Sequence, residues 1–240
     1  MTIKRPTFKP NVKAILASTA NEKRIMDFPV DSVTRVRVFP RPGDEGEIYY
    51  RAEQHFGLKY NGRNSSLACL NAHGDGTEKC PTCEVIYALM DSGDEKLKEL
   101  GKKLVINKRF YAQIRVVTYD ENKVKKFSAP KIVGFTQKAA NDINAALRMQ
   151  EDSGDDLAVD INAGQDFMVE RKGAMLATRY NVMATGKKED LDVLLPNWAD
   201  DFIHDIPKTV NLNILTRAKM VESLKASLGD VIDIDEVLGG

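Results

Sequence analysis

The sequence has few cysteines, a single tryptophan and no long hydrophobic run. The chain has 240 residues, of which three are cysteines and 7 % are aromatic. No stretch approaches the roughly 18 uncharged apolar residues of a membrane span. The N-terminus runs straight into Lys4, Arg5 and Pro6 instead of the apolar core of a signal peptide. Three cysteines are also too few for a disulfide framework. We therefore expect a cytoplasmic protein that has no membrane partner.

Familiar catalytic patterns are missing as well. The sequence contains no P-loop, no Rossmann glycine pattern, no His-Glu-x-x-His helix and no recognisable nucleophile–base arrangement. The carboxylate pairs Asp155-Asp156 and Asp200-Asp201 lie in polar stretches that are typical of solvated surface. We expect that the protein is not an enzyme.

Charge is balanced overall but unevenly distributed. The chain has 35 Lys and Arg against 35 Asp and Glu, yet residues 1–40 carry eight basic against three acidic residues. Residues 229–240 carry four acidic residues and no basic one. A basic front favours a polyanionic partner. We expect a basic arm at 1–25 and an acidic tail at 230–240 that is too short to pack and is mobile.

Hydrophobic periodicity predicts short strands with helices between them. It also predicts that residues 53–80 are irregular, that Gly101 ends a helix, and that Ile214, Ala218, Val221 and Leu228 form the buried stripe of a last helix. The expected strands cover residues 32–39, 48–52, 104–118, 123–133, 167–171 and 175–182, and the expected helices cover 84–90, 94–100, 136–147 and 207–229. This pattern favours a mixed β fold built on a small barrel over a parallel α/β sheet.

The sharpest local signal is a cluster of metal-ligand residues. Cys69, Cys80 and Cys83 are all the cysteines of the chain, and the spacing to His73 is Cys-x3-His-x6-Cys-x2-Cys. Thiolates and imidazole are the ligands that zinc prefers, and four of them close a structural site. Spacing slightly favours His73 as the fourth ligand, with His55 as the alternative. A redox dithiol at Cys80 and Cys83, or three unrelated buried thiols, are the competing interpretations.

A second signal is the interleaving of basic and aromatic residues on the predicted strands. Cations follow the phosphates of a single nucleic-acid strand, and exposed rings stack on its bases. The candidates for phosphate contacts are Arg35, Arg37, Arg51, Lys108, Arg109, Arg115, Lys125 and Lys126, and those for stacking are Phe39, Tyr49, Phe110, Tyr111, Phe127 and Tyr180. The alternatives are an interaction adaptor that is stabilised by zinc and binds acidic protein, and a thiol oxidoreductase.

These motifs resemble, in order, those of the gene-32-type single-stranded DNA-binding proteins of tailed phages. The resemblance runs from about Val33 to Val182. It rests on Val36-Arg37-Val38-Phe39-Pro40, His55-Phe56-Gly57, Asn61-Gly62, Cys69, His73-Gly74-Asp75, Cys80-Pro81-x-Cys83, Lys108-Arg109-Phe110-Tyr111-Ala112-x-Ile114, Lys123-Val124-x-Lys126-Phe127, Phe167-x-Val169 and Tyr180.

The resemblance implies an OB-fold, a five-stranded Greek-key barrel, over residues 26–206 that coats single-stranded DNA in replication, recombination and repair in the cytoplasm of an infected bacterium. It also implies an inserted zinc subdomain at about 52–103, in which one structural Zn²⁺ is held by His55 with Cys69, Cys80 and Cys83, so that His73 is not a ligand. A helix at 207–229 and the acidic tail follow. The family's basic arm binds a neighbouring protomer, and its acidic tail binds replication and recombination proteins.

Overall fold

The computed structural model describes residues 25–39, 47–151, 165–173, 178–188, 195, 203 and 205–239. The chain divides into two units, each with its own hydrophobic core. The first unit consists of residues 1–50 and 110–209, and the second of residues 51–109 and 210–240. The predicted arm, apart from Ile25, and both carboxylate pairs lie outside the described residues.

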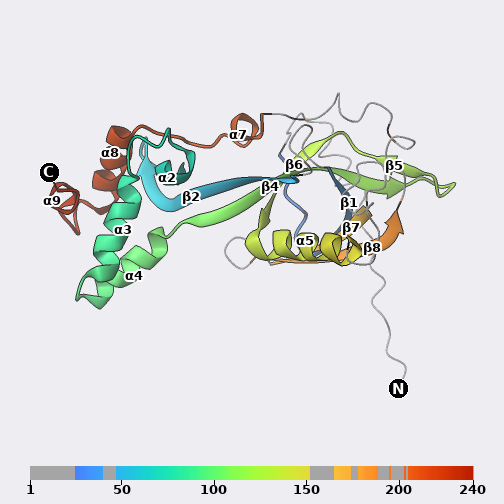
Figure 1. The fold of residues 1–240 in the computed structure, drawn as a ribbon, viewed down its shortest axis with the longest axis horizontal. Coiled ribbons are helices and arrows are strands. Elements are labelled where there is room, and N and C mark those ends of the chain that lie inside the picture. Colours follow the sequence, from blue (N-terminus) through green and yellow to red (C-terminus); the bar gives the residue numbers. More distant parts are fainter. Residues whose placement is uncertain are drawn as a thin grey trace, which may run out of the picture. The chain divides into compact units, whose positions relative to one another are not determined.

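The first unit is built on antiparallel strands (Figure 1). β1 lies between β4 and β7, β8 pairs with β7, and both β5 and β6 pair with β4. Val36 of β1 faces Val116 of β4 and Phe167 of β7, residue types that favour strands. The strands span Ser32–Phe39 (β1), Asn107–Tyr119 (β4), Lys125–Phe127 (β5), Lys131–Thr136 (β6), Gln165–Lys172 (β7) and Arg179–Lys188 (β8). The prediction of a mixed β fold with inserted helices, and not a parallel α/β sheet, is confirmed; its strands form a mostly antiparallel sheet.

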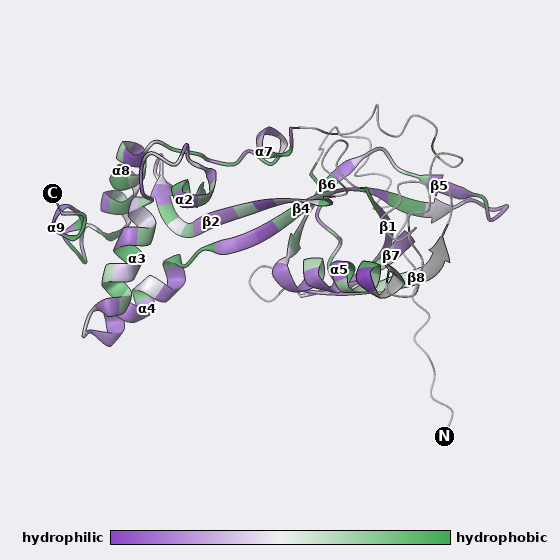
Figure 2. Ribbon diagram, in the orientation of Figure 1, coloured by the Kyte–Doolittle hydropathy of each residue, from purple (hydrophilic) through white to green (hydrophobic). Residues whose placement is uncertain are grey.

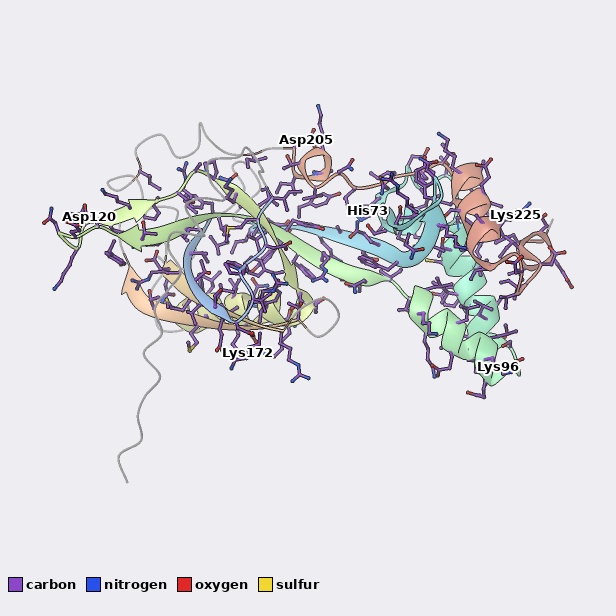
Figure 3. The ribbon with its side chains drawn as sticks, turned by 180° about the vertical axis from the view of Figure 1, so that it is seen from behind. His73, Lys96, Asp120, Lys172, Asp205 and Lys225 are labelled. Carbon is purple, nitrogen blue, oxygen red and sulfur yellow. The ribbon has the colours of Figure 1, made fainter. Side chains whose placement is uncertain are left out.

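The turn between β4 and β5 is fixed by Asp120, which Figure 3 labels at its tip. The Oδ1 atom of Asp120 accepts hydrogen bonds from the backbone N–H groups of Asn122 and Val124, at 3.0 and 2.9 Å. Lys123 between them takes a left-handed φ of 62°. Asp favours such turns because its side chain bonds the backbone nearby. The turn places Lys125, with the rest of β5, beside the end of β4.

Helix α5 (Gln137–Glu151) supplies the helical half of the first core. The hydroxyl oxygen of Thr136 accepts a hydrogen bond from the N–H of Ala139 at 3.3 Å, so it caps the helix start. Ala139, Ile143 and Leu147 are buried, as their helical spacing predicts. They pack with Phe28, Phe135 and Phe167 in one cluster.

In the second unit, β2 (Tyr49–Tyr60) and β3 (Arg63–Ala68) form a hairpin. Asn61 and Gly62 connect them with φ angles of 51° and 72°, which are those of a two-residue type I′ turn. The prediction of an irregular segment at 53–80 is therefore wrong for its first half. The error arose because the polar strand faces obscured the alternation, while the Asn-Gly pair is a known hairpin signal.

Three helices follow β3: α2 (Leu70–His73), α3 (Pro81–Asp91) and α4 (Glu95–Leu104). Figure 2 shows hydrophobic residues on α3 and α4 interspersed with hydrophilic ones. Gly101 does not end a helix as predicted but lies inside α4. A Cβ atom there would lie 3.2 Å from the Leu89 side chain and 3.3 Å from Met90, so glycine permits the close approach of α3 and α4.

The C-terminal stretch packs within the second unit instead of extending from it. Helix α7 (Ile206–Thr209) precedes it, and α8 (Arg217–Leu228) and α9 (Ile234–Val237) both contact α3. The buried stripe of α8 consists of Met220, Leu224 and Leu228, whereas Ile214 lies before the helix and is exposed. The predicted stripe is therefore right at Leu228 and wrong at Ile214 and Ala218, because the helix begins at Arg217, behind its cap Thr216, and not at residue 207.

The prediction of an unpacked tail at 230–240 is also wrong for its described part. Ile234 is 2 % exposed and belongs to the core of the second unit. The side chain of Asp233 accepts hydrogen bonds from the N–H groups of Asp235 and Glu236, so it caps α9. Ile232, Val237 and Leu238 are partly buried and pack against the same core, so several apolar contacts hold this helical turn. Among the described residues, no helix has the length and apolar character needed to cross a membrane.

Candidate metal centre and nucleic-acid interface

His55, Cys69, Cys80 and Cys83 meet in the second unit. Their ligand atoms all lie within 4.8 Å of one another, and all four residues are buried. They come from positions up to 28 residues apart along the chain. These four are the set that the family resemblance implied, and the set can hold a metal ion.

A bulge in β2 places His55. The pairing with β3 shifts register between His55 and Leu58, and Gly57 inside the bulge has a φ of 80°. A bulge re-aims the side chains on either side of it. As a result Gln54 and His55 are both buried although they are adjacent, while Phe56 is exposed.

The three cysteines lie at helix starts. Cys69 is the N-cap residue of α2, Cys80 is that of α3, and Cys83 falls in the first turn of α3 behind Pro81. The positive end of a helix dipole favours the thiolate over the thiol. Asn71 supports the turn, because its Oδ1 atom accepts a hydrogen bond from the N–H of Cys80 at 2.7 Å.

The distances fit a tetrahedral metal site. The sulfurs of Cys69 and Cys83 are 3.6 Å apart, and the Nε2 atom of His55 is 3.5 Å from the Cys80 sulfur and 3.6 Å from that of Cys83. Tetrahedral zinc with ordinary bond lengths requires about 3.8 Å between sulfurs and about 3.5 Å between sulfur and nitrogen. The other ring nitrogen, Nδ1, lies 3.0 Å from the carbonyl oxygen of Leu104. This contact turns Nε2 toward the sulfurs and fixes it as the ligand atom.

Protons and a metal ion compete for these donor atoms. Burial lowers the pKa of His55, but contacts with the Cys69 and Cys80 sulfurs and with the Leu104 carbonyl raise it, with the net result of about 10. Contacts with Cys69 and Cys83 lower the pKa of the Cys80 thiol, while contacts with Cys69 and Cys80 raise that of Cys83. A cation at the centre stabilises all the thiolates together.

His73, which spacing favoured, has another role. Its Nε2 atom accepts a hydrogen bond from the backbone N–H of Glu53 at 2.8 Å, and burial lowers the pKa of its ring. Figure 3 labels it on α2. The structure therefore gathers His55 and not His73 with the three cysteines.

In the first unit, three cations surround the carboxylate of Asp166. Arg37 and Lys125 approach it at 2.7 and 2.6 Å, and Arg35 at 3.4 Å. The side chains of Arg37, Asp166 and Lys125 are 0 %, 1 % and 7 % exposed, whereas that of Arg35 is 24 % exposed. We call these four residues the Asp166 cluster. The cluster joins β1, β5 and β7.

Aromatic rings lie over the cations of this region. The guanidinium of Arg35 lies 5.4 Å from the ring centroid of Tyr119 and donates a hydrogen bond to its hydroxyl. Lys125 and Arg37 lie 5.5 and 6.0 Å from the ring of Phe127. Tyr119 is 47 % exposed. Of these groups, Arg35 and Tyr119 are accessible, and a cation beside an accessible ring suits the phosphates and bases of a single strand.

A protein-family model described as gp32 DNA binding protein like matches residues 30–232. No curated protein matches the chain. The chain belongs to this gp32-like DNA-binding family. The match covers most of both units, and it includes the four ligand residues and the Asp166 cluster. The resemblance drawn from the sequence is confirmed.

The remaining candidates for DNA contacts range from buried to exposed. Phe39, Arg115 and Tyr180 are buried, with Arg115 5.8 Å from the ring of Phe39. Tyr49, whose pKa burial raises, packs edge-on against Phe110, with ring centroids 5.9 Å apart. The ring of Tyr111 lies close to Gly134. The buried side chains pack within the first unit.

The exposed candidates are basic. Lys126 pairs with Asp120 at 3.3 Å, and Lys108 lies 4.0 Å from Glu53, which also pairs with Arg51. Arg109 is half-buried. Arg51, Lys108 and Arg109 belong to the second unit, and the other candidates to the first. The DNA contacts of all fourteen stay predictions.

Sequence reasoning missed the buried Asp166. Asp166 precedes Phe167 in a strand, where an acidic residue carries no signal of three basic partners. The strand pattern places Tyr119 on one face with Tyr111 and Arg115 but did not single it out as a stacking residue, and the structure shows that it is exposed at the end of β4.

Proposed function

We propose that the chain binds single-stranded DNA without sequence preference and coats it during phage replication, recombination and repair. The observation that carries this is the placement of Tyr119 and Phe127 against Arg35 and Lys125 of the Asp166 cluster in a member of a DNA-binding family. Cations there contact the phosphates of the DNA, and rings stack on its bases. Neither contact depends on the edges of the bases, so binding needs no particular sequence.

We further propose that the ion held by His55 and the three cysteines is a single structural Zn²⁺. Three thiolates with one imidazole are typical of structural zinc, and four protein donors leave no position open for water or substrate. When bound, the ion supplies cross-linking energy to the fold. The protein's own residues orient the donors and exclude solvent.

The finer assignments extend this proposal. The first unit acts as the OB-fold that holds the strand, and the arm at 1–25 contacts the next protomer along the DNA. The acidic residues of the C-terminal stretch recruit replication or recombination proteins. The site of action is the cytoplasm of the infected bacterium, and the protein has no catalytic role. The support for each of these is the family membership.

A fluorescence anisotropy titration tests the proposed function. A labelled oligothymidylate is titrated with the full chain over a series of salt concentrations. We expect the logarithm of the binding constant to fall linearly with the logarithm of the salt concentration. The slope should be roughly −0.7 for each phosphate neutralised. An affinity that does not respond to salt contradicts the proposal. If the chain fails to bind the oligonucleotide but binds an acidic peptide, the result favours the alternative hypothesis of an interaction adaptor.

A further inference from the structure

The stretch from Asn213 to Arg217 bonds to the chain neighbours of three of the four ligands. The N–H of Ala68, which precedes Cys69, donates to the carbonyl oxygen of Asn213 at 2.9 Å. The side-chain amide of Asn213 donates to the carbonyl oxygen of Ser66 at 3.1 Å. We call residues 213–217 the strap. The strap is therefore linked to the ligand Cys69 through the hydrogen bond of the preceding residue, Ala68.

The guanidinium of Arg217 holds both ends of the Cys80-x-x-Cys83 turn. Its Nη1 atom donates to the carbonyl oxygen of Lys79 at 2.5 Å, and its Nη2 atom lies 2.7 Å from the Oε2 atom of Glu84. Lys79 precedes Cys80, and Glu84 follows Cys83. The Glu84 oxygen is itself buried. A planar fork of donors can span two acceptors in a fixed geometry, which a lysine ammonium cannot reproduce.

The helix that carries Arg217 shares its core with the ligands. Met220, Leu224 and Leu228 of α8 belong to the same buried cluster as Cys69, Cys80 and Cys83. Thr216 caps the start of α8 by accepting a hydrogen bond from the N–H of Lys219, so Arg217 leaves the helix from its first turn. The apolar contacts of α8 therefore fix the position from which Arg217 reaches the turn.

We propose that Arg217 is a positioning residue of the metal centre and that the strap slows the dissociation of the metal ion. This inference rests on the proposed metal. For Cys80 or Cys83 to release an ion, the turn that carries them has to open, and opening breaks the two bonds that Arg217 makes. Residues around a metal that orient its ligands typically contribute 10- to 100-fold to metal affinity.

The test measures zinc release from the full chain to an excess of a chromogenic chelator, 4-(2-pyridylazo)resorcinol. The variants are Arg217→Ala, Arg217→Lys and Glu84→Gln. Lys225→Ala is the matched control, because Lys225 lies on the same helix and its exposed side chain pairs with Asp235 at 2.7 Å, away from the ligands. Figure 3 labels Lys225 on α8. The absorption spectrum of the cobalt-substituted chain reports the ligand geometry separately.

We expect Arg217→Ala to release zinc about tenfold faster and to shift the cobalt spectrum at temperatures where the chain stays folded. Arg217→Lys and Glu84→Gln should fall between it and the wild type, and Lys225→Ala should match the wild type. Release from Arg217→Ala at the wild-type rate, or equal acceleration by Lys225→Ala, overturns the inference. If Arg217→Ala does not fold, wild-type rates for both Arg217→Lys and Glu84→Gln overturn it. A wild-type chain that binds no zinc removes the metal proposal, and the inference with it.

Discussion

The imidazole of His55 contacts two sulfurs through Nε2 and a backbone carbonyl through Nδ1, whereas His73 accepts from the backbone of Glu53. We expect His55→Ala to lose most of its zinc, because three thiolates without a fourth donor leave the ion exposed. His73→Ala should keep one zinc per chain. Zinc content by atomic absorption after purification distinguishes the two. The reverse result would move the fourth ligand to His73.

Asp166 offers a second test at the scale of single residues. In Asp166→Asn the buried charges of Arg37 and Lys125 lose their carboxylate partner, so we expect the free energy of unfolding to fall by about 3 kcal/mol. Chemical denaturation monitored by circular dichroism measures it.

Glu170→Gln is the control for this change, because Glu170 lies four residues further along the same strand and pairs with the exposed Lys172. Its unfolding should match that of the wild type. If both variants unfold alike, the Asp166 cluster has no special part in stability.

The four residues of the metal centre show how far a site can be predicted from residue types and their spacing. The three cysteines were identified from their clustering alone, since few other arrangements use thiols so close together. The histidine was not, because spacing along the chain carries no information about a bulge that turns His55 inward. The family resemblance supplied what spacing lacked.

Among the elements, α9 packs where the sequence pattern predicted an unpacked tail. Ile234 is buried, while Val231 is 59 % exposed. We expect Ile234→Ala to lower the free energy of unfolding by about 3 kcal/mol, through lost burial and the cavity that remains. Val231→Ala should have little effect. Thermal unfolding of the two variants measures this, and equal melting temperatures would mean that α9 does not hold the C-terminal stretch.

Element types followed from local pattern more often than element ends did. Strand β1 and helix α5 lie where alternation and helical spacing placed them, although β1 buries residues on both of its faces, such as Val36 and Arg37. The long hairpin of β2 and β3 was missed, since its strands mix buried polar residues such as Gln54 with exposed apolar ones such as Phe56. The start of α8 depends on its cap at Thr216, which the apolar spacing of Ile214 obscured.

At the scale of the whole molecule, each unit has its own core, and only the second contains the ligand cluster. Zinc binding in such a site becomes folding energy. We therefore expect metal removal by a chelator to lower the melting temperature of the second unit and to leave the core of the first intact. Differential scanning calorimetry of the zinc-loaded and metal-free chain resolves the two transitions. A metal-free chain with unchanged transitions would contradict a structural role.

The division into two units was less predictable than the fold class. Short strands with intervening helices indicated a mixed β fold. The return of the C-terminal stretch to pack on α3 depends on contacts between residues more than 100 positions apart, such as Arg217 with Lys79. Neither periodicity nor composition carries information about such pairing.

Competition binding tests most directly whether the chain prefers single strands. A labelled oligothymidylate bound to the full chain is displaced with unlabelled single-stranded DNA or with duplex DNA of the same length, at the same salt concentration. Rings such as Tyr119 can stack only on bases that are not already stacked in a helix. We expect the single strand to displace the label at far lower concentration than the duplex. Equal displacement by the two would show that the chain has no preference for single strands.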